Sequence, residues 1–234
     1  MYENIVDFNG DNRTDVALLR QDAGWGTMPV AFSDTDGSFT VTNEPIGNFA
    51  TNWATASGVE VLTGDFNGDN RTDVALLRQD AGWVTMPVAF SETDGSFTVT
   101  NEPIGDFASW ATASGVEVLT GDFNGDNRTD VALLRQDAGW GTMPVAFSDT
   151  DGSFTVTNEP IGNFANWATD SGVEVLTGDF NGDNRTDVAL LRQDAGWGTM
   201  PVAFSDSDGS FTVTNESIGN FANWATDSGV EILA

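Results

Sequence analysis

The sequence contains no cysteine, no histidine and no lysine, and its eight basic residues are all arginine. Without cysteine, neither a disulfide framework nor a thiolate-ligated zinc site can form. The absence of histidine and lysine excludes Ser-His-Asp and Cys-His catalysis, Schiff-base chemistry and histidine-bound transition metals. An enzyme built on this chain could use only carboxylates, hydroxyls or a metal ion, so most enzyme classes are excluded.

Positive charge is scarce, and the formal net charge is −28 over 234 residues. Such a charge opposes binding to nucleic acid or to an anionic membrane, and we expect neither partner. No apolar run approaches the roughly 18 residues of a membrane-spanning helix, so we expect no membrane insertion. The N-terminal residues MYEN lack the basic and apolar regions of a signal peptide. The sequence does not determine the cellular compartment, and an extracellular or cell-surface location is favoured.

Four near-copies of a segment of about 57 residues make up nearly the whole chain, at about 1–58, 59–115, 116–172 and 173–234. Each copy carries the block DFNGDNRTD, which starts at Asp7, Asp65, Asp122 and Asp179. Repeats of this length are typical of solenoids, propellers and arrays. Each unit is too small to bury a core of its own. We therefore expect one domain, residues 1–234, built of four units.

Each repeat contains four strand signals, at residues 58–62, 74–77, 85–91 and 97–100 of the second copy. Residues 74–77 are apolar on both faces, as in a covered strand, and Asp94-Gly95 is a tight-turn signal between the last two strands. No amphipathic helical period persists. The pattern predicts an all-β fold, a β-propeller of four-stranded antiparallel blades with four blades per chain. A parallel β-helix is the alternative, but its coils repeat over far fewer residues.

The repeated block has the oxygen spacing of a calcium loop. Side-chain oxygens recur at positions one, three, five and nine, and the arginine at position seven would offer its backbone carbonyl. An EF-hand is excluded because Leu18 stands where the bidentate Glu would be. Turn formation alone is the alternative, but four identical copies favour one structural Ca²⁺ per repeat. The predicted ligands are Asp7, Asn9, Asp11, Arg13, Asp15, Asp65, Asn67, Asp69, Arg71, Asp73, Asp122, Asn124, Asp126, Arg128, Asp130, Asp179, Asn181, Asp183, Arg185 and Asp187.

The block and its flanking strands resemble the FG-GAP and VCBS repeats of integrin α-subunit propellers. Residues 27–33 (TMPVAFS) and 36–43 (DGSFTVTN) are similar to repeats of the Psathyrella velutina lectin and its bacterial relatives. The resemblance covers all four repeats. It implies a calcium-binding β-propeller with pockets between neighbouring blades for monosaccharides such as N-acetylglucosamine or fucose. Those relatives have seven blades, whereas this chain has four repeats.

Strand topology predicts where a ligand would lie. The loops that join strands one to two and three to four emerge on one face, which carries the calcium block. The tryptophan-bearing loops, residues 21–25 and 48–57 in the first repeat, emerge on the opposite face. Packing between blades is the alternative role for these tryptophans, and the Arg20 series could bind an acidic sugar or pair with a carboxylate. The predicted ligand-binding residues are Trp25, Asn52, Trp53, Trp83, Trp110, Trp140, Asn166, Trp167, Trp197, Asn223 and Trp224.

Ring closure allows a four-bladed monomer, an eight-bladed homodimer of two chains, or a piece of a longer array. Residues 229–233 (GVEIL) repeat the sequence of a first strand, whereas residues 1–6 occupy the same place but read differently. We expect residues 229–233 to supply the innermost strand of the blade that contains Asp7, in the same chain or in a partner. The dimer is favoured.

Together, the resemblance and the repeated tryptophans predict a multivalent, calcium-stabilised lectin without catalytic activity. One alternative is an integrin-like propeller that binds a protein partner, or mediates adhesion, through one face. The other is a glycan-active enzyme that uses paired carboxylates, although four equivalent active sites would be unusual.

Overall fold

The structure is a computed structural model that describes residues 6–80, 83–194 and 197–233. The chain forms two compact units. The first comprises residues 1–112, 127–129 and 148–155, and the second comprises residues 113–126, 130–147 and 156–234. The single domain over residues 1–234 stays a prediction. Residues 1–5 and Ala234, which belong to the expected end strands, lie outside the described residues.

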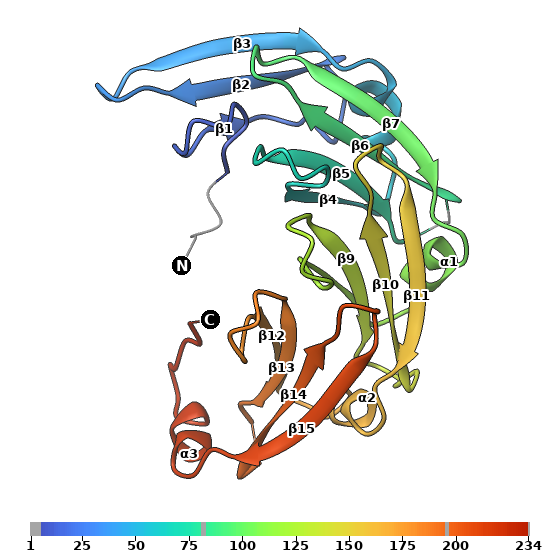
Figure 1. The fold of residues 1–234 in the computed structure, drawn as a ribbon, viewed down its shortest axis with the longest axis vertical. Coiled ribbons are helices and arrows are strands. Elements are labelled where there is room, and N and C mark those ends of the chain that lie inside the picture. Colours follow the sequence, from blue (N-terminus) through green and yellow to red (C-terminus); the bar gives the residue numbers. More distant parts are fainter. Residues whose placement is uncertain (1–5, 81–82, 195–196, 234) are drawn as a thin grey trace. The chain divides into compact units, whose positions relative to one another are not determined.

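The first unit contains two antiparallel sheets whose strands follow chain order (Figure 1). One sheet is β1 (Val16–Ala17), β2 (Thr27–Ser33) and β3 (Phe39–Pro45), followed by the π-helical turn η1 (Phe49–Trp53). The other is β4 (Val59–Gly64), β5 (Asp73–Arg78), β6 (Thr85–Ser91) and β7 (Phe97–Pro103), followed by α1 (Phe107–Ala111).

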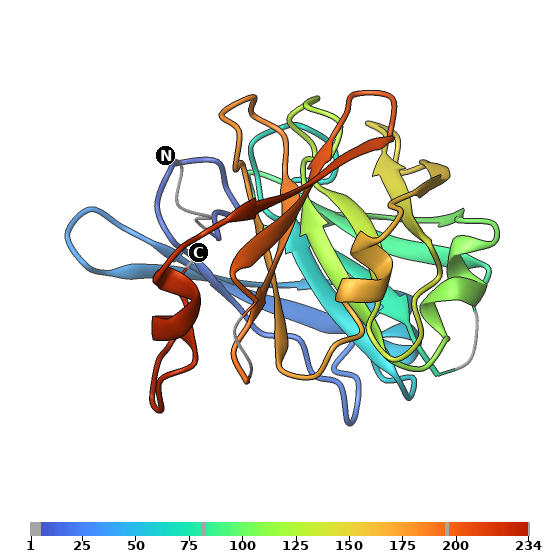
Figure 2. The same cartoon turned by 90° about the horizontal axis from the view of Figure 1, so that it is seen from below.

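The remaining two sheets have the same order. One is β8 (Val116–Gly121), β9 (Asp130–Arg135), β10 (Thr142–Ser148) and β11 (Phe154–Pro160), followed by α2 (Phe164–Trp167). The last is β12 (Val173–Gly178), β13 (Asp187–Arg192), β14 (Thr199–Ser205) and β15 (Phe211–Ser217), followed by α3 (Phe221–Ala225). Figure 2 shows α3 directly after the end of β15. Each sheet is a blade, with four strands in three of the sheets and three described strands in the first. The predicted all-β propeller fold of antiparallel blades is therefore confirmed.

Two features differ from the expectation. A short helical turn follows the outermost strand of every repeat, and its four or five residues are too few to show a helical period in sequence. The expected strand at residues 229–233 is not formed in the single chain. A strand needs a partner for its N–H and C=O groups, and the described part of the second unit supplies none. No helix of the described chain is long and apolar enough to cross a membrane.

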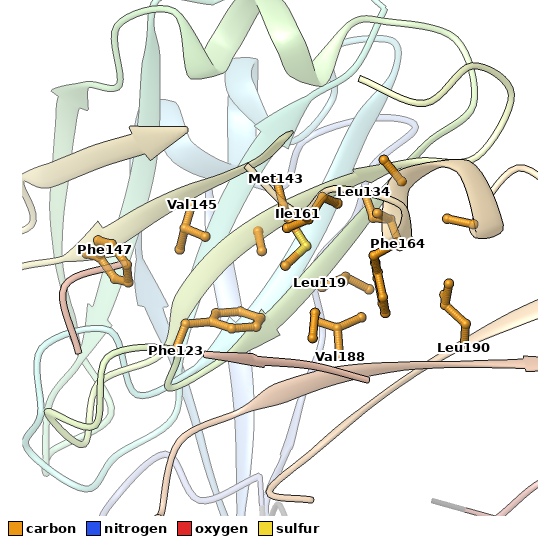
Figure 3. Close-up of a cluster of buried hydrophobic side chains, with 14 residues drawn as sticks. Leu119, Phe123, Leu134, Met143, Val145, Phe147, Ile161, Phe164, Val188 and Leu190 are labelled. Carbon is orange, nitrogen blue, oxygen red and sulfur yellow. The ribbon is translucent and has the colours of Figure 1, made fainter. Parts of the chain in front are cut away.

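The cores lie between successive repeats rather than inside them. In the second unit, Leu119 and Val145 of one sheet share a cluster with Val188 and Leu190 of the next (Figure 3). Phe164 of α2 joins this cluster and is fully buried. The first unit has the equivalent cluster. A repeat therefore obtains its core from its neighbour, as expected for a unit of this size.

The calcium block also joins successive repeats through the backbone. The N–H of the threonine at position eight donates to the carbonyl of the first aspartate of the preceding block. The three bonds, from Thr72 to Asp7, from Thr129 to Asp65 and from Thr186 to Asp122, are each 2.6 Å long. At the second and third of these bonds, Gly64 and Gly121 at the ends of β4 and β8 permit the approach of the threonine side chain.

Gly121→Ala is expected to destabilise the fold. A Cβ at Gly121 would lie 2.5 Å from the side chain of Thr186, which is closer than real side chains approach. Overpacking of this kind costs about 1–3 kcal/mol, measurable by chemical denaturation. Gly198→Ala is the matched control, because its Cβ would meet nothing within 4 Å and its φ is not left-handed. Equal losses of unfolding free energy in the two variants would contradict this role of the contact.

Candidate functional site

A cavity of about 320 Å³ lies between the first and second repeats, on the tryptophan-bearing side. Trp53 comes from η1 of the first repeat and Trp83 from the loop before β6 of the second. The cavity therefore pairs tryptophans from successive repeats. Its lining is Trp53, Trp83, Val84, Thr85, Pro87 and Asn101.

The second unit repeats this pairing. Trp167 of α2 and Trp197 before β14 both pack, partly buried, against the same apolar cluster. In the first unit Trp53 and Trp83 share a cluster in the same way. The junction between repeats, rather than the repeat itself, is therefore the element that brings two aromatic rings together.

The helical turn explains how Trp53 reaches the cavity. The N–H of Ala54 donates to the carbonyl of Phe49 over 2.8 Å and closes the turn. Phe49 is fully buried in the core, whereas Trp53, four residues later, is only partly buried at its edge. The buried phenylalanine anchors the turn and presents the tryptophan at the rim of the junction.

An arginine covers one side of each loop tryptophan. The guanidinium carbon of Arg78 lies 5.7 Å from the Trp83 ring centroid, and the pair recurs at 5.7–5.8 Å in all four repeats. Arg78 Nε also donates to Asp80 and to the carbonyl of Ser57 in the preceding repeat, each over 3.0 Å. The arginine series is therefore paired with carboxylates, and it braces the tryptophan across the junction.

The aspartates of these pairs are held ionised. The hydrogen bond and the charge of Arg20 lower the pKa of the exposed Asp22. A hydrogen bond from Ser57, together with Arg78, lowers the pKa of Asp80. Asp22 is thus paired with Arg20, the arginine of its own repeat.

Asn101 is a lining residue that the sequence reasoning missed. It stands opposite Pro87 in the β6–β7 pair. Proline has no N–H to donate, so the ladder is interrupted beside the asparagine. Asn52, which was expected to bind ligand, donates to Asn48 Oδ1 over 2.9 Å and does not line the cavity. The signal that could have found Asn101 is the TVTN sequence at the end of each outermost strand, facing a TMP segment.

The other predicted residues occupy three environments. Asn166 and Asn223 are exposed on their helical turns, and Ser109 replaces asparagine in the second repeat. Trp110 and Trp140 are partly buried and belong to different units. Trp25 and Trp224 are 49% and 62% exposed, more than the other six.

On the opposite side, each block closes its loop with its own oxygens. Asp65 Oδ1 accepts the N–H of Gly68 over 2.7 Å, and Oδ2 accepts that of Asn70 over 2.7 Å. Asn70 has a φ of +63°, a left-handed conformation that asparagine tolerates. Asp7 and Asp179 make the same bonds in their loops.

The arginine at position seven supplies positive charge inside the block. Arg71 pairs with Asp69, and its Nε donates to the carbonyl of Ser91 over 2.7 Å. The carbonyl bond recurs in all four repeats. The arginine therefore ties the loop to the third strand of its own blade.

Aspartate at position nine is the most buried member of the block. Asp73 accepts the N–H of Phe66 through Oδ2 and that of Ser91 through Oδ1. Burial raises the pKa of Asp73 to about 8, against the lowering effect of these two bonds, and the charges of Asp69 and Asp65 raise it further. Burial likewise raises the pKa values of Asp15 and Asp187.

The predicted calcium ligands fit the ion by donor type. All donors are oxygens, which Ca²⁺ prefers. The described residues, however, contain no group of three or more acidic side chains positioned to hold a metal ion. The block oxygens are instead bonded to N–H groups and arginine. Calcium binding thus stays a prediction.

A second cavity, of about 260 Å³, opens on the block side of the same junction. It carries the Arg13 guanidinium, three aspartate and asparagine side chains and a single aromatic ring. Its lining is Asn9, Arg13, Phe32, Ser33, Asp34, Thr40, Thr42, Thr93 and Asp94. The predicted division into a block face and a tryptophan face therefore holds within the first unit.

The FG-GAP-like repeat family model matches residues 7–76, 65–133 and 122–190. The chain belongs to the FG-GAP-like repeat family. Each matched range runs from one block into the second strand of the next repeat, so the family's unit spans the junction described above. No curated protein matches the chain.

Among solved structures, this FG-GAP-like chain is similar to an Agrocybe aegerita lectin described for its specific recognition of non-reducing terminal N-acetylglucosamine. The TM-score is 0.67 at 21% sequence identity, over 91% of this chain and 51% of that one. The chain thus spans about half the length of the lectin. At this identity the likeness shows the fold.

The raised pKa of Asp73 predicts a pH dependence of the metal-free protein. A carboxyl whose folded pKa lies above its unfolded value stabilises the fold fully below pH 4, and this stabilisation is lost as the pH rises through about 8. In chelator, the unfolding free energy should fall between pH 5 and pH 8, by an amount on the order of 1–3 kcal/mol. Denaturant titrations measure it. Asp73→Asn should flatten the profile, and an unchanged slope in that variant would contradict the assignment.

Proposed function

We propose that this FG-GAP-like propeller is a multivalent carbohydrate-binding protein whose pockets lie at the junctions between repeats. The observation that carries the proposal is the cavity between Trp53 and Trp83. A second tryptophan pair, Trp167 and Trp197, occupies the equivalent place in the second unit. The recognition of terminal N-acetylglucosamine described for the Agrocybe aegerita lectin supports a sugar of this class as the ligand.

The cavity offers what a pyranose ring requires. One side of Trp83 is covered by Arg78, and the part of the ring that lines the cavity offers an apolar surface to the C–H face of a sugar. Asn101 supplies both a donor and an acceptor for hydroxyl or acetamido groups, and Thr85 supplies a hydroxyl. Val84 is 72% exposed at the rim and would be covered by a bound methyl group. N-acetylglucosamine and fucose both carry such a methyl.

Repetition of the pocket raises the overall affinity for a glycan. A shallow pocket for one sugar binds weakly, and several pockets on one molecule raise the overall affinity for a branched glycan through effective concentration. We propose no catalytic role, because the lining of the Trp53–Trp83 cavity contains no carboxylate. A two-carboxylate glycosidase mechanism has no acid or nucleophile there.

Trp83→Ala is expected to abolish the pocket between the first and second repeats. Loss of an aromatic platform at a binding centre costs about 2 kcal/mol or more, which is roughly thirty-fold in affinity. Calorimetric titration with N-acetylglucosamine should then show fewer sites per chain, while the sites that remain keep the wild-type affinity.

Trp83→Tyr is the matched control, since it keeps the ring and should retain the site. The double variant Trp83→Ala/Trp197→Ala should lose the sugar pockets at both junctions. Unchanged melting temperatures separate these effects from unfolding. Wild-type stoichiometry in the double variant would overturn the assignment of the pockets.

We also propose that Ca²⁺ stabilises the blocks without forming part of the sugar pocket. The support is the oxygen-only composition of the block and the mutual repulsion of its carboxylates, seen in the effect of Asp65 and Asp69 on Asp73. Millimolar Ca²⁺ should raise the melting temperature relative to EDTA, and Mg²⁺ should do so less. Identical melting curves in Ca²⁺ and EDTA would contradict a calcium site.

A further inference from the structure

The first and last repeats expose apolar side chains that the inner repeats bury. In the last repeat, Phe221 is 50% exposed and Phe180 is 37% exposed, although their copies Phe164 and Phe123 are buried. In the first repeat, the exposed side chains are Val16, Leu18, Phe39 and Val41. Exposed apolar surface of this extent in a soluble chain marks an interaction site.

These two sets are the two halves of the contact that successive repeats make. In the first unit, Phe8 meets Phe97 of the next repeat edge-on, with ring centroids 6.3 Å apart. Phe180 is the copy of Phe8, and Phe39 is the copy of Phe97.

The helical turn shows the same complementarity. Phe49 packs in one cluster with Val74, Leu76 and Val99 of the next repeat. The exposed Phe221 is the copy of Phe49. The exposed Val16, Leu18 and Val41 are the copies of its three partners.

The segment at residues 229–233 completes the match. It has the sequence of the first strands β4, β8 and β12, yet it forms no strand, and Leu233 is 89% exposed. In the second repeat Val61 stands opposite Leu76, and Leu62 opposite Ala75. By the same register, Ile232 would stand opposite Leu18, and Leu233 opposite Ala17, on the exposed edge of β1.

We propose that the last repeat of one copy docks on the first repeat of a second copy, in the way that neighbouring repeats dock within the chain. Two such contacts, one at each end of the chain, would close two copies into a two-fold dimer. A second copy is the occupant because this chain covers only 51% of the Agrocybe aegerita lectin, so two copies supply the length of one such propeller. The last repeat of the same chain presents the same side chains, and its docking on the first repeat would leave the protein at the single-chain mass.

The dimer also completes a ligand site, a consequence that rests on the proposed function. Trp224 is the copy of Trp53, and Trp25 is the copy of Trp83. Trp224 is the most exposed of the four tryptophans on the helical turns, and Trp25 is the most exposed of the four in the loops before the third strands. Docking pairs Trp224 of one copy with Trp25 of the second copy, and each interface thus gains one pocket that a single chain lacks.

Disulfide trapping tests the register, because the chain has no native cysteine. Leu18→Cys and Ile232→Cys are purified separately and mixed under oxidising conditions. Directly opposed strand residues lie within disulfide reach, so a cross-linked band of two chains should form. Asp34→Cys mixed with Ile232→Cys is the control and should give no such band. No cross-link with Leu18→Cys would overturn the proposed pairing.

The mass in solution tests the dimer itself. At 0.15 M salt, where the repulsion between chains of charge −28 is screened, light scattering should give twice the chain mass of 24.8 kDa. Phe221→Asp should give the single-chain mass with its circular dichroism intact, because the side chain is exposed in the single chain. Wild-type protein at the single-chain mass would overturn the proposal.

Sugar titration separates the two proposals. Phe221→Asp should lose the Trp224–Trp25 pocket and keep those that Trp83→Ala and Trp197→Ala remove. If no variant binds sugar while the cross-link and the double mass persist, the proposed function fails and the docking stands. If Phe221→Asp becomes a single chain with unchanged sugar stoichiometry, the shared pocket is contradicted.

Discussion

The hydrogen bond from the threonine of each block to the first aspartate carbonyl of the block before it is the contact on which the fold depends. It is 2.6 Å long at all three junctions. Gly64 and Gly121, which precede the second and third blocks, leave room for the side chains of Thr129 and Thr186. No repeat can bury a core alone, so each blade depends on a neighbouring repeat for its core. The acidic block therefore connects one repeat to the next. The arginine of each of the four blocks also fixes its loop to the third strand of its own blade, through the serine carbonyl.

The same constraint creates the proposed ligand site. A fixed junction places the helical turn of one repeat beside the loop before the third strand of the next, which brings Trp53 to Trp83 and Trp167 to Trp197. Arg78 reinforces this geometry, since it contacts Trp83 while it bonds to Ser57 of the preceding repeat. If each junction holds a pocket, as proposed, the number of pockets follows from the number of junctions and grows when a second copy supplies another junction.

The content of a repeat could be predicted from sequence, but the geometry between repeats could not. Alternating and fully apolar runs predicted the four strands, and Asp94-Gly95 predicted a hairpin turn, because these signals are local. The short turns such as Phe49–Trp53 were missed, since five residues show no helical period. The pairing of tryptophans across a junction, and the place of Asn101 rather than Asn52 in the cavity, depend on how blades pack. The block's oxygen spacing also concealed that backbone N–H groups and arginine already use those oxygens.

A crystal structure of the protein grown with N-acetylglucosamine would show directly where the sugar binds. We expect sugar density at the junctions on the tryptophan side, against Trp83 and Trp197, with Asn101 bonded to the sugar in the first of these sites. Sugar bound instead in the cavity beside Arg13 and Asp94, with the tryptophan pairs empty, would contradict this expectation.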